Sequence, residues 1–233
     1  ASMISTLAPP EPAQTHNVLG LLPGRDPALA GEVIILGAHY DHVGDDPGAE
    51  DCAGDGTNEQ SNMQCQTSAR RYRGANDNAS GVAGMLEIAR LWQEQEFQPR
   101  RSVLFAAWAG GEWPYSGAHD FRDNRRGFTS RYNIAAVVHL DRLATLSDGA
   151  TSGSAASGDG LVVHQAGRGD SLLNLLASSA ERLDLSVWQT TVLRRHYHHV
   201  FSGEYGDQLG GRNGTLVVTW GDPQPALASD TVD

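Results

Sequence analysis

The chain has 233 residues, with 28 acidic against 17 basic side chains and a formal net charge of -11. This length suits one sizeable α/β domain with a buried core, so we expect a single domain over residues 1–233. The acidic excess argues against a nucleic-acid partner or an anionic membrane surface. No apolar run is long enough to cross a membrane. The first residues lack the basic and apolar regions of a signal peptide, and a mature or trimmed chain would look the same.

Six apolar segments have the composition of β-strands. Several are continuously apolar rather than alternating, which is typical of a sheet covered on both faces. Their ranges are 18–22, 33–38, 103–108, 134–140, 161–164 and 215–220. Helix-like segments lie between them, one capped by Asn78 or Ser80 and another by Asp170. The alternation predicts a single three-layer α/β domain with a mainly parallel or mixed central sheet and helices on both faces.

Two long polar stretches, 44–73 and 147–160, do not fit this alternation and are expected to be loops, the first of them an insertion. Cys52 and Cys65 lie in the first stretch. A disulfide between them would close a short loop and contribute roughly 3 kcal/mol to stability. Such a bond indicates an oxidising environment, so we expect a secreted or extracytoplasmic protein; two free thiols are the alternative.

Side chains that bind metals follow the strand-like segments. His39, Glu112 and Asp141 each come one to four residues after such a segment. Ligands of open α/β sheets gather beyond the carboxyl ends of the strands. Asp77 opens the first helix-like segment, and His199 follows late in the chain. We therefore expect these five side chains to converge on one cleft and to hold two metal ions.

The ligand types favour zinc. Three carboxylates and a bridging hydroxide balance the charge of two divalent ions, and two neutral imidazoles complete the set. Mixed histidine and carboxylate coordination suits zinc more than calcium or magnesium. Asp41, two residues after His39, is better placed to orient that imidazole than to bind metal.

These motifs resemble the dizinc aminopeptidases of metallopeptidase family twenty-eight, whose relatives include glutamate carboxypeptidase and glutaminyl cyclase. The most specific matches are Gly-Ala-His-Tyr-Asp-His-Val-Gly at 37–44 and Gly-Ala-Asn-Asp-Asn-Ala-Ser-Gly at 74–81. The other matching stretches are 17–20, 82–84, 104–117, 140–141, 199–200, 219–222 and 230–233. The resemblance implies a doubly covered mixed sheet, two Zn²⁺ ions and exopeptidase activity on peptides.

Carried over position by position, the resemblance assigns a ligand set. His39 and Asp141 would bind one zinc, Glu112 and His199 the other, and Asp77 would bridge them. The family's final histidine normally follows an aspartate, whereas His196-Tyr197-His198-His199 stands here, so the choice of ligand among three histidines stays open. The family domain also continues into one more helix, which implies that this chain lacks its last helix.

The main departure is Gly111. The family places two adjacent glutamates here, the first as general base and the second as metal ligand, but this chain reads Gly111-Glu112. Loss of general acid–base catalysis costs about 10² to 10⁴ in rate, so weak or lost activity is expected unless His196 or His198 substitutes. On this reasoning Gly111→Glu would raise activity at least about tenfold.

Two other functions stay open. One is a non-catalytic, metal-containing binding domain of the same fold, of the kind that the transferrin receptor resembles, and the other is a glutaminyl cyclase-like acyltransferase. The sequence predicts neither the preferred substrate side chain nor the oligomeric state.

Overall fold

A computed structural model describes most of the α/β core of the protein. The described residues are 14–42, 44–46, 50–52, 65–67, 70–71, 74–112, 116–124, 128, 130–144, 160–166, 170–190 and 214–220. His196, His198, His199 and the closing motif at 230–233 lie outside these ranges. None of the described helices is long and apolar enough to cross a membrane.

A seven-stranded mixed sheet forms the centre of the fold. Its order is β1 (Val18–Leu22), β7 (Ser102–Trp108), β2 (Glu32–His39), β8 (Asn133–Leu140), β11 (Thr215–Trp220), β9 (Gly160–Ala166) and β10 (Ser186–Thr190). The four inner strands from β7 to β11 run parallel. β1 pairs antiparallel with β7, and β9 pairs antiparallel with β11 but parallel with β10. This confirms the predicted mixed α/β fold.

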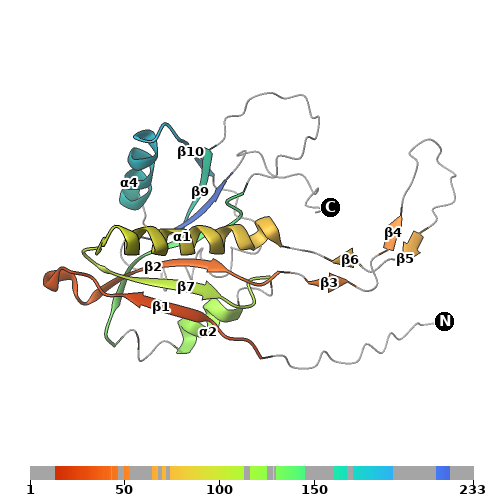
Figure 1. Ribbon diagram of the computed structural model, residues 1–233, viewed down its shortest axis with the longest axis horizontal. Coiled ribbons are helices and arrows are strands. Elements are labelled where there is room, and N and C mark those ends of the chain that lie inside the picture. Colours follow the sequence, from red (N-terminus) through yellow and green to blue (C-terminus); the bar gives the residue numbers. More distant parts are fainter. Residues whose placement is uncertain are drawn as a thin grey trace.

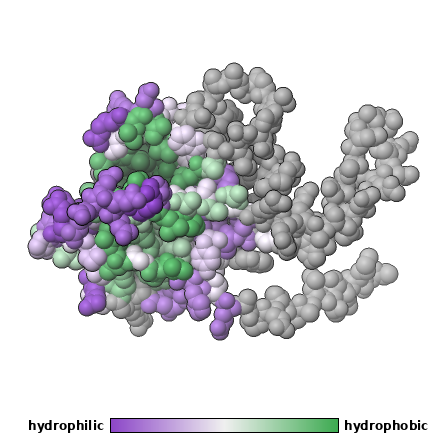
Figure 2. Space-filling model, in the orientation of Figure 1, coloured by the Kyte–Doolittle hydropathy of each residue, from purple (hydrophilic) through white to green (hydrophobic). Residues whose placement is uncertain are grey.

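Helices cover both faces of this sheet, as the continuous apolar strands predict (Figure 1). α1 (Gly81–Glu94) and α4 (Asp170–Glu181) pack on one face, where Met85, Ile88 and Leu173 join the buried strand residues. α2 (Ser116–Asn124) packs on the other face, where Phe121 contacts Trp108 at a ring-centroid distance of 5.3 Å. Hydrophilic residues follow the outer side of α1, with apolar areas on either side of it (Figure 2).

The expected strands are all present, and 18–22 and 215–220 have the predicted bounds. β10 and α2 were missed. β10 carries only one aliphatic and one aromatic residue in five, and α2 has few apolar positions, so neither has a clear periodic pattern. A short 3₁₀ helix, η1 (Pro27–Leu29), joins β1 to β2; the Asp26 carboxylate caps it.

The 44–73 segment, which we expected to be a loop, contains short strands that its composition does not predict. β3 (Asp45–Asp46) pairs antiparallel with β6 (Arg70–Arg71), and β4 (Glu50–Cys52) pairs antiparallel with β5 (Cys65–Thr67). Ladders of two and three residues are too short to produce an alternating pattern. Cys52 is the register partner of Cys65. Their side chains lie outside what the structure describes, and no bond between them is described, so the disulfide stays a prediction.

Candidate metal centre

Three adjacent parallel strands end at the same edge of the sheet and bring the predicted ligands there. His39 is the last residue of β2, Asp141 directly follows β8, and Glu112 follows β7 by four residues. β7 and β8 are the two neighbours of β2. Because parallel strands share the direction of their carboxyl ends, residues far apart in the chain meet here.

Asp77 lies in the turn before α1, which begins after Ser80, one of the two expected caps. The turn is η2 (Ala75–Ser80), in which Asp77 and Asn78 have non-helical backbone angles and a cis peptide bond joins them. Asn78 is almost fully buried, and its side chain supports the turn. Its Nδ2 donates to the carbonyl of Leu140 at 3.0 Å, and its Oδ1 accepts from the backbone N–H of Gly81 at 3.1 Å.

The donor atoms of His39, Asp77 and Glu112 all lie within 4.8 Å of one another. His39 Nε2 is 3.3 Å from Asp77 Oδ1 and 3.6 Å from Asp141 Oδ1. His39 is 2 % exposed, so these donors lie at the buried end of the site. Four of the five predicted ligands therefore gather at one place, while His199 lies outside the described residues.

The residues present fit a zinc ion. An imidazole nitrogen with carboxylate oxygens is a donor set that zinc takes in proteins. Asp141 is 1 % exposed, and within the described residues neither of its carboxylate oxygens has a hydrogen-bond partner. Such a group is costly to bury unless a cation compensates for its lost hydration.

The electrostatics of the cluster also favour a cation. Burial alone would lower the pKa of His39, but the surrounding carboxylates outweigh burial and raise this pKa from 6.5 to about 12. Without metal, the imidazole is therefore protonated and supplies the positive charge that the carboxylates require. Burial and the charge of Asp77 raise the pKa of Glu112, which shows that the two carboxylates repel each other.

Asp41 contacts the cluster differently from the expectation. Its carboxylate Oδ1 accepts from the backbone N–H of Gly111 at 2.6 Å, and its Oδ2 accepts from that of Glu112 at 3.1 Å. His39 Nδ1 lies 3.1 Å from the carbonyl oxygen of Asp41 and 3.7 Å from its carboxylate. The carboxylate thus mainly holds the loop that carries Glu112, and the Asp41 carbonyl is the nearer partner of the imidazole.

Gly111 lies against the side chain of His39. A Cβ atom at Gly111 would stand 2.3 Å from both Cβ and Cγ of His39. The backbone of Gly111 is outside the left-handed region, so the obstacle to a side chain is contact rather than backbone conformation. The histidine Cβ is fixed to a buried strand and has little freedom to move. The expectation that Gly111→Glu simply restores a base is therefore not supported by the geometry.

Two histidines that the sequence did not single out belong to the surroundings of the cluster. His42 Nδ1 lies 3.1 Å from Glu112 Oε1. His139, in β8, is fully buried, and its ring is parallel to that of His39 at a centroid distance of 6.2 Å. Burial lowers the pKa of His139 to about 3, so it is neutral. The position of His139 two residues before Asp141 was the one available sequence signal, because alternate residues of a strand share a face.

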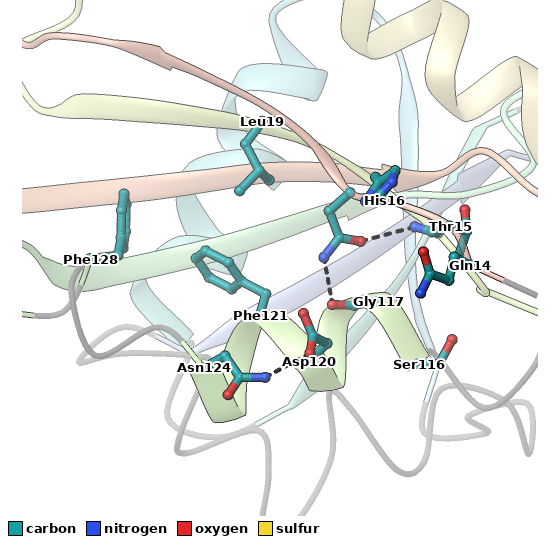
Figure 3. A pocket seen from close by; sticks show the side chains of 12 residues that line it. Gln14, Thr15, His16, Leu19, Ser116, Gly117, Asp120, Phe121, Asn124 and Phe128 are labelled. Atoms are coloured by element: carbon teal, nitrogen blue, oxygen red, sulfur yellow. Dashed lines mark hydrogen bonds between the residues drawn. The ribbon is translucent and has the colours of Figure 1, made fainter.

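A pocket of about 830 Å³ lies beside the loop that carries Glu112 (Figure 3). β1, the chain before it and α2 form its walls. Asn17 lines it, accepting from the N–H of Ala109 at 3.1 Å and donating to the carbonyl of Gly117 at 2.8 Å. None of the described predicted ligands lines this pocket, so it is separate from the metal cluster.

Comparisons with solved structures agree with this fold. A zinc aminopeptidase from Bacillus subtilis superposes with a TM-score of 0.58 at 19 % identity, over 89 % of this chain and 40 % of that chain. A glutaminyl cyclase from Bacteroides thetaiotaomicron bound to N-acetylhistamine gives a TM-score of 0.54 at 18 % identity, over 89 % and 64 %. At these identities the likeness shows the shared fold alone.

Sequence comparisons identify the family. A probable zinc metalloprotease from Phaeosphaeria nodorum is 29 % identical over 139 residues, which are 56 % of this chain and 24 % of that protein. The chain thus spans about a quarter of the length of that relative. Residues 17–181 match Peptidase family M28, a range that includes every described residue of the metal cluster. The chain therefore belongs to Peptidase family M28.

Proposed function

We propose that the chain is a zinc-dependent exopeptidase domain of the aminopeptidase type, which removes N-terminal residues from peptides. The observation that carries this proposal is the donor set of His39, Asp77 and Glu112, which gathers where the carboxyl ends of β2 and β7 meet the turn before α1. Membership of a peptidase family and the fold of a zinc aminopeptidase support it. The substrate of the whole protein is part of the proposal, since the chain spans only part of its relatives.

Each described residue has a distinct part in this proposal. Zinc, when bound, supplies a Lewis acid for a peptide carbonyl and lowers the pKa of a bound water. His39, Asp77 and Glu112 would hold it. Asp41 fixes the Glu112 loop through two backbone N–H groups, which keeps the ligand carboxylate in place. Where two ions bind, the family resemblance assigns His39 and Asp141 to one, Glu112 and a histidine from 196–199 to the other, and Asp77 to both.

The described residues contain no carboxylate at the position of the general base, because Gly111 stands there. This observation favours a second candidate function, a metal-containing binding domain without catalysis. His196 and His198, the other candidates for the base, lie outside the described residues. Turnover separates the two functions, since both would bind zinc.

The test is a panel of aminoacyl chromogenic substrates, assayed with the metal-free and the zinc-loaded chain. We expect hydrolysis only with zinc, and loss of hydrolysis in Asp77→Asn. Zinc binding without hydrolysis of any substrate in the panel would reject the aminopeptidase and favour the binding domain. An N-terminal glutaminyl peptide belongs in the panel, because its cyclisation would instead indicate the cyclase reaction.

A secreted or extracytoplasmic location is also part of the proposal. It rests on the Cys52 and Cys65 pair, whose backbones are register partners in β4 and β5. Directly opposed residues of antiparallel strands have Cα atoms about 4.5 to 5.5 Å apart, which suits a disulfide.

A further inference from the structure

His42 lies beside Glu112, one of the three donors of the metal cluster. Its Nδ1 is 3.1 Å from Glu112 Oε1, and the two side chains are only 16 % and 18 % exposed. An ionised carboxylate only accepts hydrogen bonds, so the imidazole is the donor in this pair. A hydrogen bond between two largely buried groups is stronger than one in water, so this contact restricts how the carboxylate can turn.

The imidazole is itself held by close packing against Gly74. A Cβ atom at Gly74 would stand 2.7 Å from both Cβ and Cγ of His42, so a larger residue there would displace the histidine. Gly74 precedes the turn that carries Asp77, and its carbonyl accepts from the N–H of Ala79 in that turn at 3.0 Å. Its φ of +65° is a second reason for glycine at this position. His42 therefore contacts both the start of the Asp77 turn and the side chain of Glu112.

Two neighbouring side chains after β2 hold Glu112 in different ways. The Asp41 carboxylate accepts from the backbone N–H groups of Gly111 and Glu112 and so fixes the loop. Backbone contacts alone do not fix a carboxylate at the end of a flexible side chain, because its rotamers remain available. The hydrogen bond from His42 acts on that carboxylate directly. The segment 39–42 thus supplies one donor of the cluster and holds another.

The geometry favours a positioning role for His42 over a role as ligand. Within the described residues, the donor atoms that lie within 4.8 Å of one another belong to His39, Asp77 and Glu112, and His42 is outside this group. Its Nδ1 is instead engaged with Glu112 Oε1. Carboxylates that bind metals are commonly hydrogen-bonded in turn, and losing such a partner typically costs about 10- to 100-fold in metal affinity or activity.

We propose that His42 is a positioning residue for Glu112. Its imidazole, packed against Gly74, holds the Glu112 carboxylate where it meets the donors of His39 and Asp77. This inference rests on the proposed zinc-dependent function and deepens it, because it gives a part in zinc binding to a residue that does not itself bind the ion.

The test is calorimetric titration of the metal-free full chain with zinc chloride at one fixed pH. His42→Leu removes the hydrogen-bond donor and keeps a side chain of comparable size. His42→Asn loses the ring but keeps an N–H donor near the position of Nδ1, so it is the rescue variant. His16→Leu is the matched control, because His16 is an exposed histidine outside the cluster.

We expect His42→Leu to weaken zinc binding by about 10- to 100-fold, and His42→Asn to recover most of that loss. His16→Leu should leave the zinc affinity unchanged. A side chain that only fills space would give the reverse order, since leucine replaces the volume of the imidazole better than asparagine does. Circular dichroism checks that each variant is folded, and His42→Ala replaces His42→Leu if that variant is not.

A double-mutant cycle separates positioning from direct binding. If His42 acts through Glu112, His42→Leu should have little further effect on zinc affinity in the Glu112→Ala background. A histidine that bound zinc itself would show its full effect in both backgrounds. Where Glu112→Ala binds zinc too weakly to titrate, the comparison of the leucine and asparagine variants decides alone.

Wild-type zinc affinity in a folded His42→Leu variant would overturn the inference. Equal losses of affinity in His42→Leu and His42→Asn, or a full effect of His42→Leu in the Glu112→Ala background, would overturn it as well. Each of these outcomes leaves the zinc-dependent function intact. If the wild-type chain binds no zinc, the proposed function fails first, and this inference fails with it.

Discussion

Gly111 is the residue at which sequence and structure lead to different conclusions. The sequence shows only that the family's glutamate is absent, and from this we expected Gly111→Glu to raise activity. The structure shows that the space for a Cβ is taken by the side chain of His39, at 2.3 Å. The glycine is therefore part of the packing around a predicted ligand, and any side chain there changes that ligand's position.

We predict that Gly111→Ala lowers zinc affinity at least about tenfold, because the new methyl group displaces the His39 ring from the other donors. Calorimetric titration with zinc measures the change. Gly31→Ala is the control, since a Cβ at Gly31 has no atom within 4 Å. Equal zinc affinity of the Gly111→Ala and wild-type proteins would show that His39 has room to move or does not bind zinc.

The raised pKa of His39 leads to a second prediction at this scale. Because the pKa of His39 is raised to about 12, its imidazole carries a proton that zinc must displace. Near pH 7 to 9 we therefore expect about one proton to be released from His39 per zinc bound, and zinc affinity to increase with pH by up to about tenfold per unit. Calorimetry in buffers of different ionisation enthalpy counts the protons.

His39→Asn is the informative variant for this prediction. It removes the titrating imidazole, so both the proton released from this residue and the corresponding pH dependence should disappear. If the variant releases as many protons as the wild-type chain, the protons come from another group and His39 is not the ligand.

At the scale of elements, Asn78 ties the turn before α1 to the end of β8. It makes three side-chain hydrogen bonds to the backbone, with Leu140, Gly81 and Arg142, and it is 1 % exposed. These bonds hold the turn that carries Asp77 against the end of β8, which Asp141 follows. The sequence suggested Asn78 only as a helix cap.

We predict that Asn78→Ala destabilises the protein by roughly 2 to 4 kcal/mol, because three backbone groups lose a buried partner. Chemical denaturation of the metal-free chain measures this free energy of unfolding. Asn124→Ala is the comparison: Asn124 makes one exposed side-chain bond, to Asp120, and its loss should cost less than about 1 kcal/mol. Similar losses of unfolding free energy in the two variants would show that the Asn78 hydrogen bonds do not stabilise the fold more than an exposed one does.

At the scale of the whole molecule, the short strands β3 to β6 lie beside the central sheet rather than in it (Figure 1), in the chain segment between the first two predicted ligands, His39 and Asp77. Because β4 and β5 place Cys52 opposite Cys65, we predict that the two are bonded after expression in an oxidising compartment. Thiol titration under denaturing conditions should then find no free thiol. Two free thiols per chain would contradict both the bond and the inferred compartment.

Much of the fold follows from local sequence. The strands could be predicted because they are buried on both faces and are therefore continuously apolar. α1 could be predicted because its apolar residues recur on one side of the helix. β10 and α2 could not be predicted, since short or polar elements owe their structure to neighbours rather than to their own pattern. The ladders of the insertion were missed for the same reason.

The sequence by itself predicted that His39, Asp77, Glu112 and Asp141 would meet, because a metal centre needs particular donor types and strand ends are places where they can come together. Only the tertiary structure decided how those side chains act on one another. The contact of Gly111 with His39 and the hydrogen bonds from Gly111 and Glu112 to Asp41 join residues about 70 positions apart, which meet only because β2 and β7 are neighbours in the sheet. Local pattern carries no information about such distances, which packing alone fixes.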